Sequence, residues 1–186
     1  MKKLICALSL LGIINVCSAE TSAFVGLGSQ TDNTTGSQTI VKLVNIGTSI
    51  TKNIAVDFWV IDKDNLDTNV ITDRFEPGIT LSEKVGELTP FIRFGVGEKQ
   101  KSGAQGFYYY TAETGSKYDV TKDLTVKASY YYRQSFDDYN LDQSQAVRLS
   151  TNYKLTQKDS ITVGYFYDVG GYNTAKTIWA GYSRSF

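Results

Sequence analysis

The stretch Leu124-Thr-Val126-Lys-Ala128-Ser-Tyr130-Tyr-Tyr132-Arg133 alternates apolar and polar residues, and this alternation decides the fold. Successive side chains of a β-strand point to opposite faces, so a period of two predicts a strand with one apolar and one polar face. The same alternation recurs in 147–155, 161–168 and 178–186. Because helical periodicity is absent beyond residue 19, the sequence predicts an all-β protein.

Four turns, each with a lysine among turn-forming residues, separate the predicted strands. They are Thr51-Lys52-Asn53, Ser82-Glu83-Lys84, Thr121-Lys122-Asp123 and Gln157-Lys158-Asp159. Their lysines are 32, 38 and 36 residues apart. This spacing fits two membrane strands of roughly 10 residues each with one tight turn and one longer loop. The repeating unit is therefore a β-hairpin.

These signals predict ten strands. They lie near 22–30, 38–50, 54–61, 69–82, 90–99, 105–118, 124–134, 144–155, 160–168 and 175–186. An even number places both termini on one side of the membrane, as in bacterial barrels. The predicted fold class is an all-β, transmembrane, antiparallel up-and-down β-barrel of about ten strands, with eight or twelve strands as alternatives.

The first third of the chain leaves the eight-stranded alternative open. Lys42 and Asn45 cannot both face inward without a β-bulge, and Pro77-Gly78 interrupts a strand where a hydrogen-bond donor is missing. The outward-facing loops are expected around 31–36, 62–68, 100–104, 135–143 and 169–174.

The first nineteen residues predict a cleaved secretory signal peptide. Lys2 and Lys3 precede an apolar segment at 4–16, and Cys17-Ser18-Ala19 supplies the small residues of a cleavage site. A membrane anchor and a lipid-modified Cys17 are the alternatives, but the apolar segment is shorter than the roughly 20 residues that span a bilayer. Residues 20–186 then form the barrel domain.

Composition limits the partners of this domain. Residues 20–186 carry 17 Lys and Arg against 19 Asp and Glu, a formal charge of −2, so no nucleic-acid partner is expected. They contain no cysteine, which suits a chain that crosses the oxidising periplasm unfolded.

Charged residues fix which face of each strand meets lipid. With the apolar residues outward, Arg93, Lys127 and Arg148 point into the lumen. A shift of one residue would place each in lipid, at a cost of about 2–4 kcal/mol near the midplane. The outward aromatic residues then fall at alternate ends of alternate strands, as in the two aromatic girdles of a membrane protein. They are Tyr130, Tyr132, Tyr165 and Tyr167 at one end and Tyr153, Tyr182 and Phe186 at the other.

The last strand has apolar residues at alternate positions before a terminal aromatic residue: Ile178, Ala180, Tyr182 and Phe186. This pattern resembles the C-terminal signal by which assembly machinery recognises outer-membrane proteins, although Arg184 departs from the usual apolar choice. The chain thus resembles the bacterial outer-membrane β-barrel superfamily, in particular small porin-like members. The resemblance implies a location in the Gram-negative outer membrane, with lipid, lipopolysaccharide and the assembly machinery as partners.

The inward positions hold an uneven set of charges. The cations are Arg74, Arg93, Lys117, Lys127, Arg133, Arg148 and Lys154, with Lys42 also expected, and the anions are Asp57, Glu76, Glu113 and Asp168. Either these residues pair and fill a narrow lumen, or an excess of roughly four cations favours the passage of anions. The second interpretation is weakly similar to the oligogalacturonate-specific porin family, which implies small anionic solutes, although that family is expected to have twelve strands.

The amino-acid composition gives little support for an enzymatic function. The chain has no histidine, so a Ser-His-Asp arrangement cannot form, and no catalytic residue, cofactor or metal site is predicted. The predicted function is a small porin-like channel with an anion-leaning lumen for passive solute diffusion and ion transport. The alternative is a closed barrel that stabilises the outer membrane or binds a partner through its loops.

Overall fold

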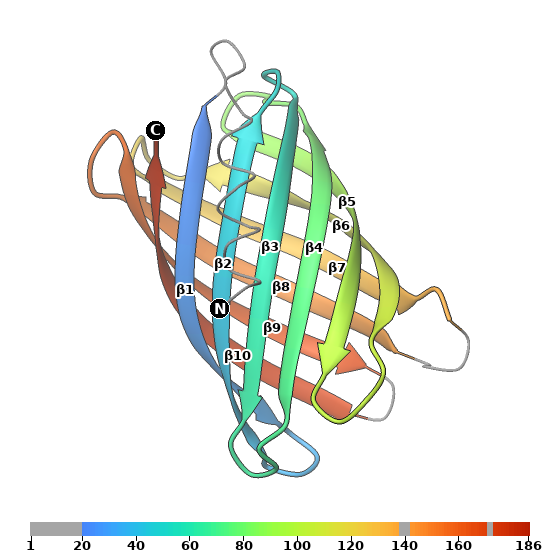
Figure 1. The fold of residues 1–186 in the computed structure, drawn as a ribbon. Helices are drawn as coiled ribbons and strands as arrows, with labels where there is room; N and C mark the ends of the chain where they lie inside the picture. The colour runs from blue at the N-terminus through green and yellow to red at the C-terminus, as the bar shows by residue number, and fades with distance from the viewer. Residues whose placement is uncertain (1–19, 138–141, 171–172) are drawn as a thin grey trace.

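A computed structural model of the protein describes residues 20–137, 142–170 and 173–186, and the predicted signal peptide lies outside this part. Ten strands form one closed antiparallel barrel in which each strand pairs with its neighbours in sequence and β1 pairs with β10 (Figure 1). The strands are β1 Thr21–Asp32, β2 Gln38–Ser49, β3 Ile54–Asn65, β4 Ile71–Ser82, β5 Leu88–Lys101, β6 Phe107–Asp119, β7 Leu124–Ser135, β8 Gln143–Lys154, β9 Asp159–Gly170 and β10 Asn173–Ser185. The predicted count of ten is confirmed, and the alternatives of eight and twelve are wrong. The described residues contain no helix that is long and apolar enough to cross a membrane.

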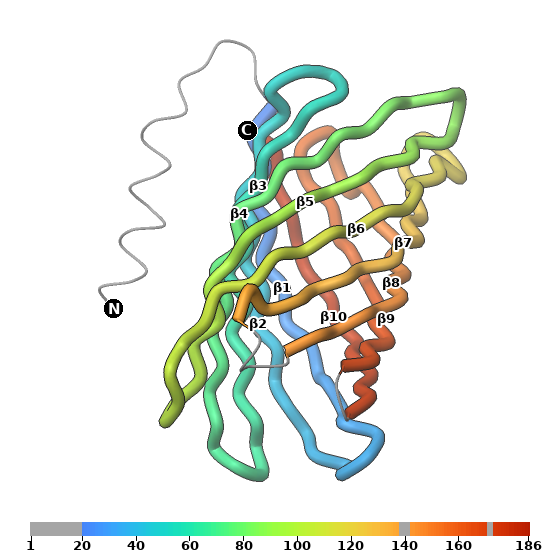
Figure 2. The backbone as a smooth tube through the Cα atoms, turned by 90° about the vertical axis from the view of Figure 1, so that its right-hand side faces the viewer, coloured from blue at the N-terminus to red at the C-terminus, as the bar shows by residue number. Residues whose placement is uncertain are grey.

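The pairing registers make the barrel narrow and its strands strongly tilted. Paired residues can be followed once around the barrel, from Ser22 through Arg133 to Asn173. Continuing in the β1–β10 register then leads to position 34, twelve residues beyond the start. Such a stagger requires strands inclined to the barrel axis, as Figure 2 shows. In barrels of about this size the inward side chains occupy much of the interior.

Lys42 faces outward, which corrects the prediction that it points into the lumen. The β1–β2 and β2–β3 registers run without a break through Lys42 and Asn45, so no bulge allows both residues to face inward. Asn45 lines the interior. Lys42 lies on the outer surface, where its Nζ is 2.5 Å from Asp64 Oδ2 and 3.3 Å from Asp62 Oδ1. This pairing also explains why β3 continues to Asn65, into the segment that was expected to be a loop.

Pro77 does not end β4. Its ladder with β3 is continuous, and Pro77 lies opposite Phe58. The ladder with β5 is interrupted at Glu76 and Pro77 but resumes in the same register at Gly78. The missing N–H of Pro77 therefore interrupts the pairing of β4 with β5 but not its pairing with β3.

Three of the four lysine-containing turns share one structure. The side-chain oxygen of Thr51 accepts hydrogen bonds from the N–H groups of Asn53 and Ile54, at 3.2 and 3.1 Å. Thr121 and Thr156 do the same for the residues two and three positions after them. The turn between β4 and β5 is longer and contains Gly86, with a φ of 64° that a residue with a side chain rarely adopts. These four turns lie at the barrel end where β1 begins and β10 ends, hereafter the inner end.

Candidate functional site: the lumen

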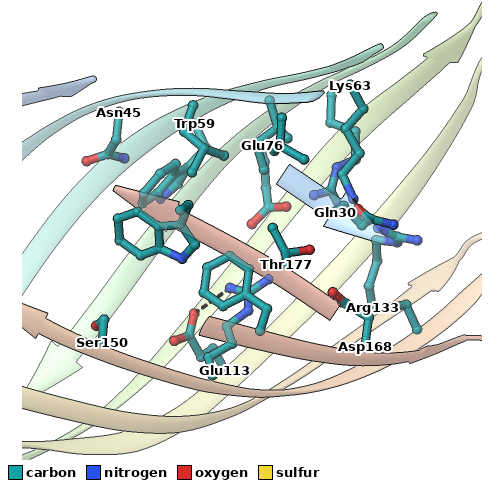
Figure 3. A pocket seen from close by; sticks show the side chains of 18 of the residues that line it. Gln30, Asn45, Trp59, Lys63, Glu76, Glu113, Arg133, Ser150, Asp168 and Thr177 are labelled. Carbon is teal, nitrogen blue, oxygen red and sulfur yellow. Dashed lines mark hydrogen bonds and ion pairs between the residues drawn. The ribbon is translucent and has the colours of Figure 1, made fainter. Parts of the chain in front are cut away.

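One cavity of about 1130 Å³ occupies the barrel interior and is lined by residues of all ten strands. Its lining includes Ser22 and Ser183 near the inner end, and Asp32 and Asn173 near the opposite, outer end. The cavity therefore extends along the barrel axis. Figure 3 shows polar and aromatic side chains from several strands converging on it.

Most of the predicted lumen residues line this cavity. They are Asp57, Arg74, Glu76, Arg93, Glu113, Lys117, Lys127, Arg133, Arg148 and Asp168. Lys154, the last residue of β8, is exposed and is absent from the cavity lining. A role of these residues in solute passage stays a prediction.

Several charged residues of the lumen were missed by sequence reasoning. They are Asp32, Lys63, Lys99, Lys101, Asp119 and Asp142. The first five lie near strand ends, and Lys63 belongs to the part of β3 that was expected to be a loop. Continued alternation from Asp57 along β3 would have identified Lys63. The cavity lining holds nine Lys or Arg and seven Asp or Glu, so the excess is two cations, smaller than the four expected.

Glu76 is the centre of a buried polar network on the wall formed by β4–β7. Its Oε1 lies 2.6 Å from Arg93 Nη1, and the hydroxyl groups of Tyr109, Thr111 and Tyr131 donate to its two oxygens at 3.2, 3.2 and 3.4 Å. Arg93 also binds Asp57, with Nη2 2.6 Å from Oδ1. Glu76 is only 3% exposed, and a carboxylate so buried requires these partners.

Glu113 organises a second network beside the first. Lys127 Nζ and Arg148 Nη1 lie 2.6 and 3.2 Å from its oxygens, and Ser129 donates a hydrogen bond of 2.7 Å. The Arg148 guanidinium also lies over the Tyr131 ring, 3.5 Å from its centre. The cation is thereby held by a carboxylate and by an aromatic face.

Asp142 forms a third network near the outer end. It precedes β8 and accepts from Arg133 Nη2 at 2.9 Å and from Lys99 Nζ at 3.1 Å. Burial alone would raise the pKa of the Asp142 carboxyl, but the two cations outweigh burial and lower that pKa below its ordinary value. Asp142 therefore stays ionised at neutral pH.

The opposite wall of the lumen is hydrophobic. Val41, Leu43, Ile61 and Trp179 form a buried cluster on β2, β3 and β10, with Phe24, Trp59 and Phe166 packed against it. The rings of Phe24 and Trp179 meet edge to face with centres 5.5 Å apart. Inward glycines provide the space for these rings: a side chain on Gly164 would approach Trp179 to 2.3 Å, and one on Gly181 would approach Phe24 to 2.3 Å.

Two tyrosines contribute to the lumen instead of to a girdle. Tyr109 and Tyr131 are fully buried side chains that face inward. Of the outward residues predicted for the girdles, Tyr130, Tyr153, Tyr167, Tyr182 and Phe186 are exposed on the outer surface, and Tyr132 and Tyr165 are half-buried. On β10, Ile178 and Ala180 also face outward, and the exposed Phe186 follows the strand.

No protein-family profile matches the sequence, and no curated protein matches it. Among solved structures, the chain is similar to an outer-membrane channel of Pseudomonas putida F1, with a TM-score of 0.59 at 8% identity, covering 93% of this chain and 97% of the channel. Its fold is that of a bacterial outer-membrane β-barrel.

Two further barrels support this assignment. The NanC porin matches with a TM-score of 0.55 at 13% identity, over 87% of this chain and all of the porin. The translocator domain of the autotransporter NalP from Neisseria meningitidis matches with a TM-score of 0.51 at 10% identity, over all of this chain and 94% of the domain. At these identities the matches show the shared fold alone. The outer-membrane location that the sequence predicts agrees with this fold.

Proposed function

We propose that the protein is a narrow, non-enzymatic channel for the passive diffusion of small solutes, with a preference for anions. The cavity that extends along the barrel axis, from Ser22 and Ser183 to Asp32 and Asn173, carries this proposal. In a barrel with only a structural role, inward side chains could fill the interior, so a cavity of about 1130 Å³ that extends along the axis supports a channel.

The preference for anions follows from the charges of the lining. The cations exceed the anions by two, and the positive charge lies in a confined space bounded by a low-dielectric protein wall. Such a geometry concentrates the electrostatic field and raises the local concentration of anions. The networks of Glu76 and Glu113 narrow the passage between the two ends, so we expect a small conductance.

Single-channel recording in a planar bilayer tests the proposal. We expect discrete steps of small conductance, and a reversal potential in a salt gradient that is displaced in the direction of anion permeation. Lys117→Glu reverses an exposed lumen charge and should reduce the displacement, whereas Lys52→Glu changes a turn residue outside the cavity and should have less effect.

The same recording can support the alternative, a closed barrel with a structural or interacting role. Its specific support is the buried networks in which Glu76 and Glu113 hold Arg93 and Arg148 at the centre of the lumen. A protein that folds and inserts but conducts no current would contradict the channel.

We also propose that the outward side of β10, with Ile178, Ala180 and Tyr182, and the following Phe186 are recognised by the outer-membrane assembly machinery. Their exposure on the surface supports direct contact with a partner. Lipid and lipopolysaccharide are proposed to surround the remaining outer surface, where Leu27, Val96 and Val147 are exposed.

A further inference from the structure

Four cations gather in the outer half of the lumen: Lys63, Arg74, Lys99 and Arg133. Arg74 and Lys99 lie directly opposite each other across the β4–β5 ladder. Lys63 interacts electrostatically with Arg74, Lys99 and Arg133. Figure 3 shows Lys63 and Arg133 at the same end of the pocket, beside Gln30 and Asp168. We call these four residues the outer cation cluster.

The ion pairs formed among the described residues do not neutralise this cluster. Asp142 forms ion pairs with Lys99 and Arg133. Asp168 interacts electrostatically with Lys63 and Arg74, but it forms no ion pair within 4.0 Å in the described part of the chain. Like charges placed directly opposite each other on paired strands destabilise a sheet. The described side chains thus leave positive charge in excess here.

The excess charge of the lumen is confined to this half. In the inner and central part, the cations Arg93, Lys117, Lys127 and Arg148 are matched in number by the anions Asp57, Glu76, Glu113 and Asp119. In the outer half, the described lining residues are the outer cation cluster and Lys101 on the positive side and Asp32, Asp142 and Asp168 on the negative side. The net excess of two cations is therefore a local property of the outer half.

Arg74 differs from the other members of the cluster. Asp142 pairs with Lys99 and Arg133, and Gln30 accepts a hydrogen bond from Lys63, whereas no ion pair or side-chain hydrogen bond joins Arg74 to a described residue. The Arg74 side chain lines the cavity and is 7% exposed, and its Nε has no hydrogen-bond partner among the described residues. Glu76 is near, but Arg93, Tyr109, Thr111 and Tyr131 already bind its two oxygens. A buried guanidinium without a paired anion carries a large desolvation penalty that a bound anion would offset.

We infer that the outer half of the lumen binds a small solute that carries at least two negative charges on phosphate or carboxylate oxygens. Arg74 binds these oxygens with its planar set of N–H donors, and Lys63 adds a second positive charge on the neighbouring strand. Gln30 holds Lys63 in place, with Lys63 Nζ 2.5 Å from Gln30 Oε1. This inference rests on the proposed channel, because the solute enters through the outer end, but binding itself does not require conduction.

Binding is tested with the purified protein in detergent micelles. Inorganic phosphate and succinate are titrated separately at constant ionic strength, and isothermal titration calorimetry records the affinity. The thermal unfolding midpoint is measured alongside. We expect saturable binding of at least one of the two anions and a rise of the midpoint that chloride does not produce. The comparison of phosphate with succinate identifies the oxyanion that the site prefers.

Two variants locate the site. Arg74→Gln should weaken binding by about tenfold or more, because it removes a charged hydrogen-bond donor from the ligand. Lys117→Gln removes an exposed lumen cation from the inner half and should leave the affinity within about twofold of the original. Because Arg74 lacks an ion pair within the described part, Arg74→Gln should fold, and far-ultraviolet circular dichroism verifies this.

The outcomes separate the site from the channel. If the protein binds an anion saturably, loses this binding in the Arg74→Gln variant and conducts no current, the site is supported and the channel is contradicted. Two results with a conducting protein would overturn the site and leave the channel intact. One is that neither phosphate nor succinate binds. The other is that the Arg74→Gln variant binds them as tightly as the unaltered protein does.

Discussion

At the scale of single residues, the stability of the central lumen depends on the buried ion pairs of Glu76 and Glu113. Replacement of Glu76 by glutamine keeps its shape but removes the negative charge that Arg93 binds at 2.6 Å. Because this leaves a buried cation underpaired, we expect the free energy of unfolding to fall by about 3–5 kcal/mol. Urea unfolding in lipid vesicles measures the change. Glu83→Gln, an exposed turn substitution, is the control; equal stability of the two variants would show that the Glu76 network contributes little.

The Asp142 pair gives a residue-scale prediction on pH. The pKa of Asp142 is lowered in the folded protein, so its contribution to stability is complete above the unfolded-state value of about 3.9 and is lost as pH falls through the folded-state pKa. Asp142→Asn should therefore reduce the free energy of unfolding by about 2 kcal/mol at pH 7. The difference from the unaltered protein should shrink below about pH 4. Unfolding measured at several pH values checks this, and a difference that stayed constant down to pH 2 would contradict it.

At the scale of the strand, two positions of β8 on opposite faces of the barrel wall should differ sharply in their tolerance of charge. Val147 faces outward and is 51% exposed on the surface that contacts lipid, whereas Ser150 lines the cavity. Val147→Arg should cost about 2–4 kcal/mol of stability in a bilayer. Ser150→Arg places the same side chain in a polar space and should cost clearly less. Unfolding in lipid vesicles compares the two, and the reverse order of stabilities would contradict the register of β8.

Strand alternation explains how far the fold could be predicted. A period of two, with Arg93, Lys127 and Arg148 excluded from lipid, predicted ten strands with bounds close to those observed. The same rule misplaced Lys42 because a local pairing with Asp62 and Asp64 lets a charged residue face outward near a strand end.

The organisation of the lumen was less accessible from sequence. Which cation meets which carboxylate depends on the stagger of ten strands, a property of the whole barrel that no single strand encodes. The contact of Arg93 on β5 with Asp57 on β3 crosses an intervening strand, and Asp142 reaches the lumen from a loop. Tyr109 and Tyr131 could not be singled out from the sequence, because the tyrosines next to them face outward and fit an aromatic girdle.

At the scale of the whole molecule, barrel closure and assembly both involve the last residue. The Phe186 N–H donates to the Thr21 carbonyl at 2.9 Å, next to the β1–β10 ladder, while the residue as a whole is 70% exposed. Phe186→Ala keeps the backbone bond and removes the ring, so it should reduce insertion into the outer membrane of cells more than it reduces refolding in detergent. Deletion of Phe186 removes both contacts and should impair both processes. Cell fractionation and gel-shift assays of folded barrel measure these effects; unchanged insertion of both variants would contradict a role in recognition.

The two unlike walls of the lumen have a consequence for the orientation of whatever enters it. The aromatic and aliphatic cluster of Trp179, Phe24 and Val41 faces the networks of Glu76 and Glu113 and the cations bound to them. The electrical potential therefore varies across the barrel as well as along it, and a molecule with an ionic head and a nonpolar tail experiences a torque. Such a molecule would lie across the lumen as it passes, with its ionic head against β4–β8 and its nonpolar tail against β2, β3 and β10. Passage would then discriminate between isomers of equal size and charge that differ only in where the charge is attached.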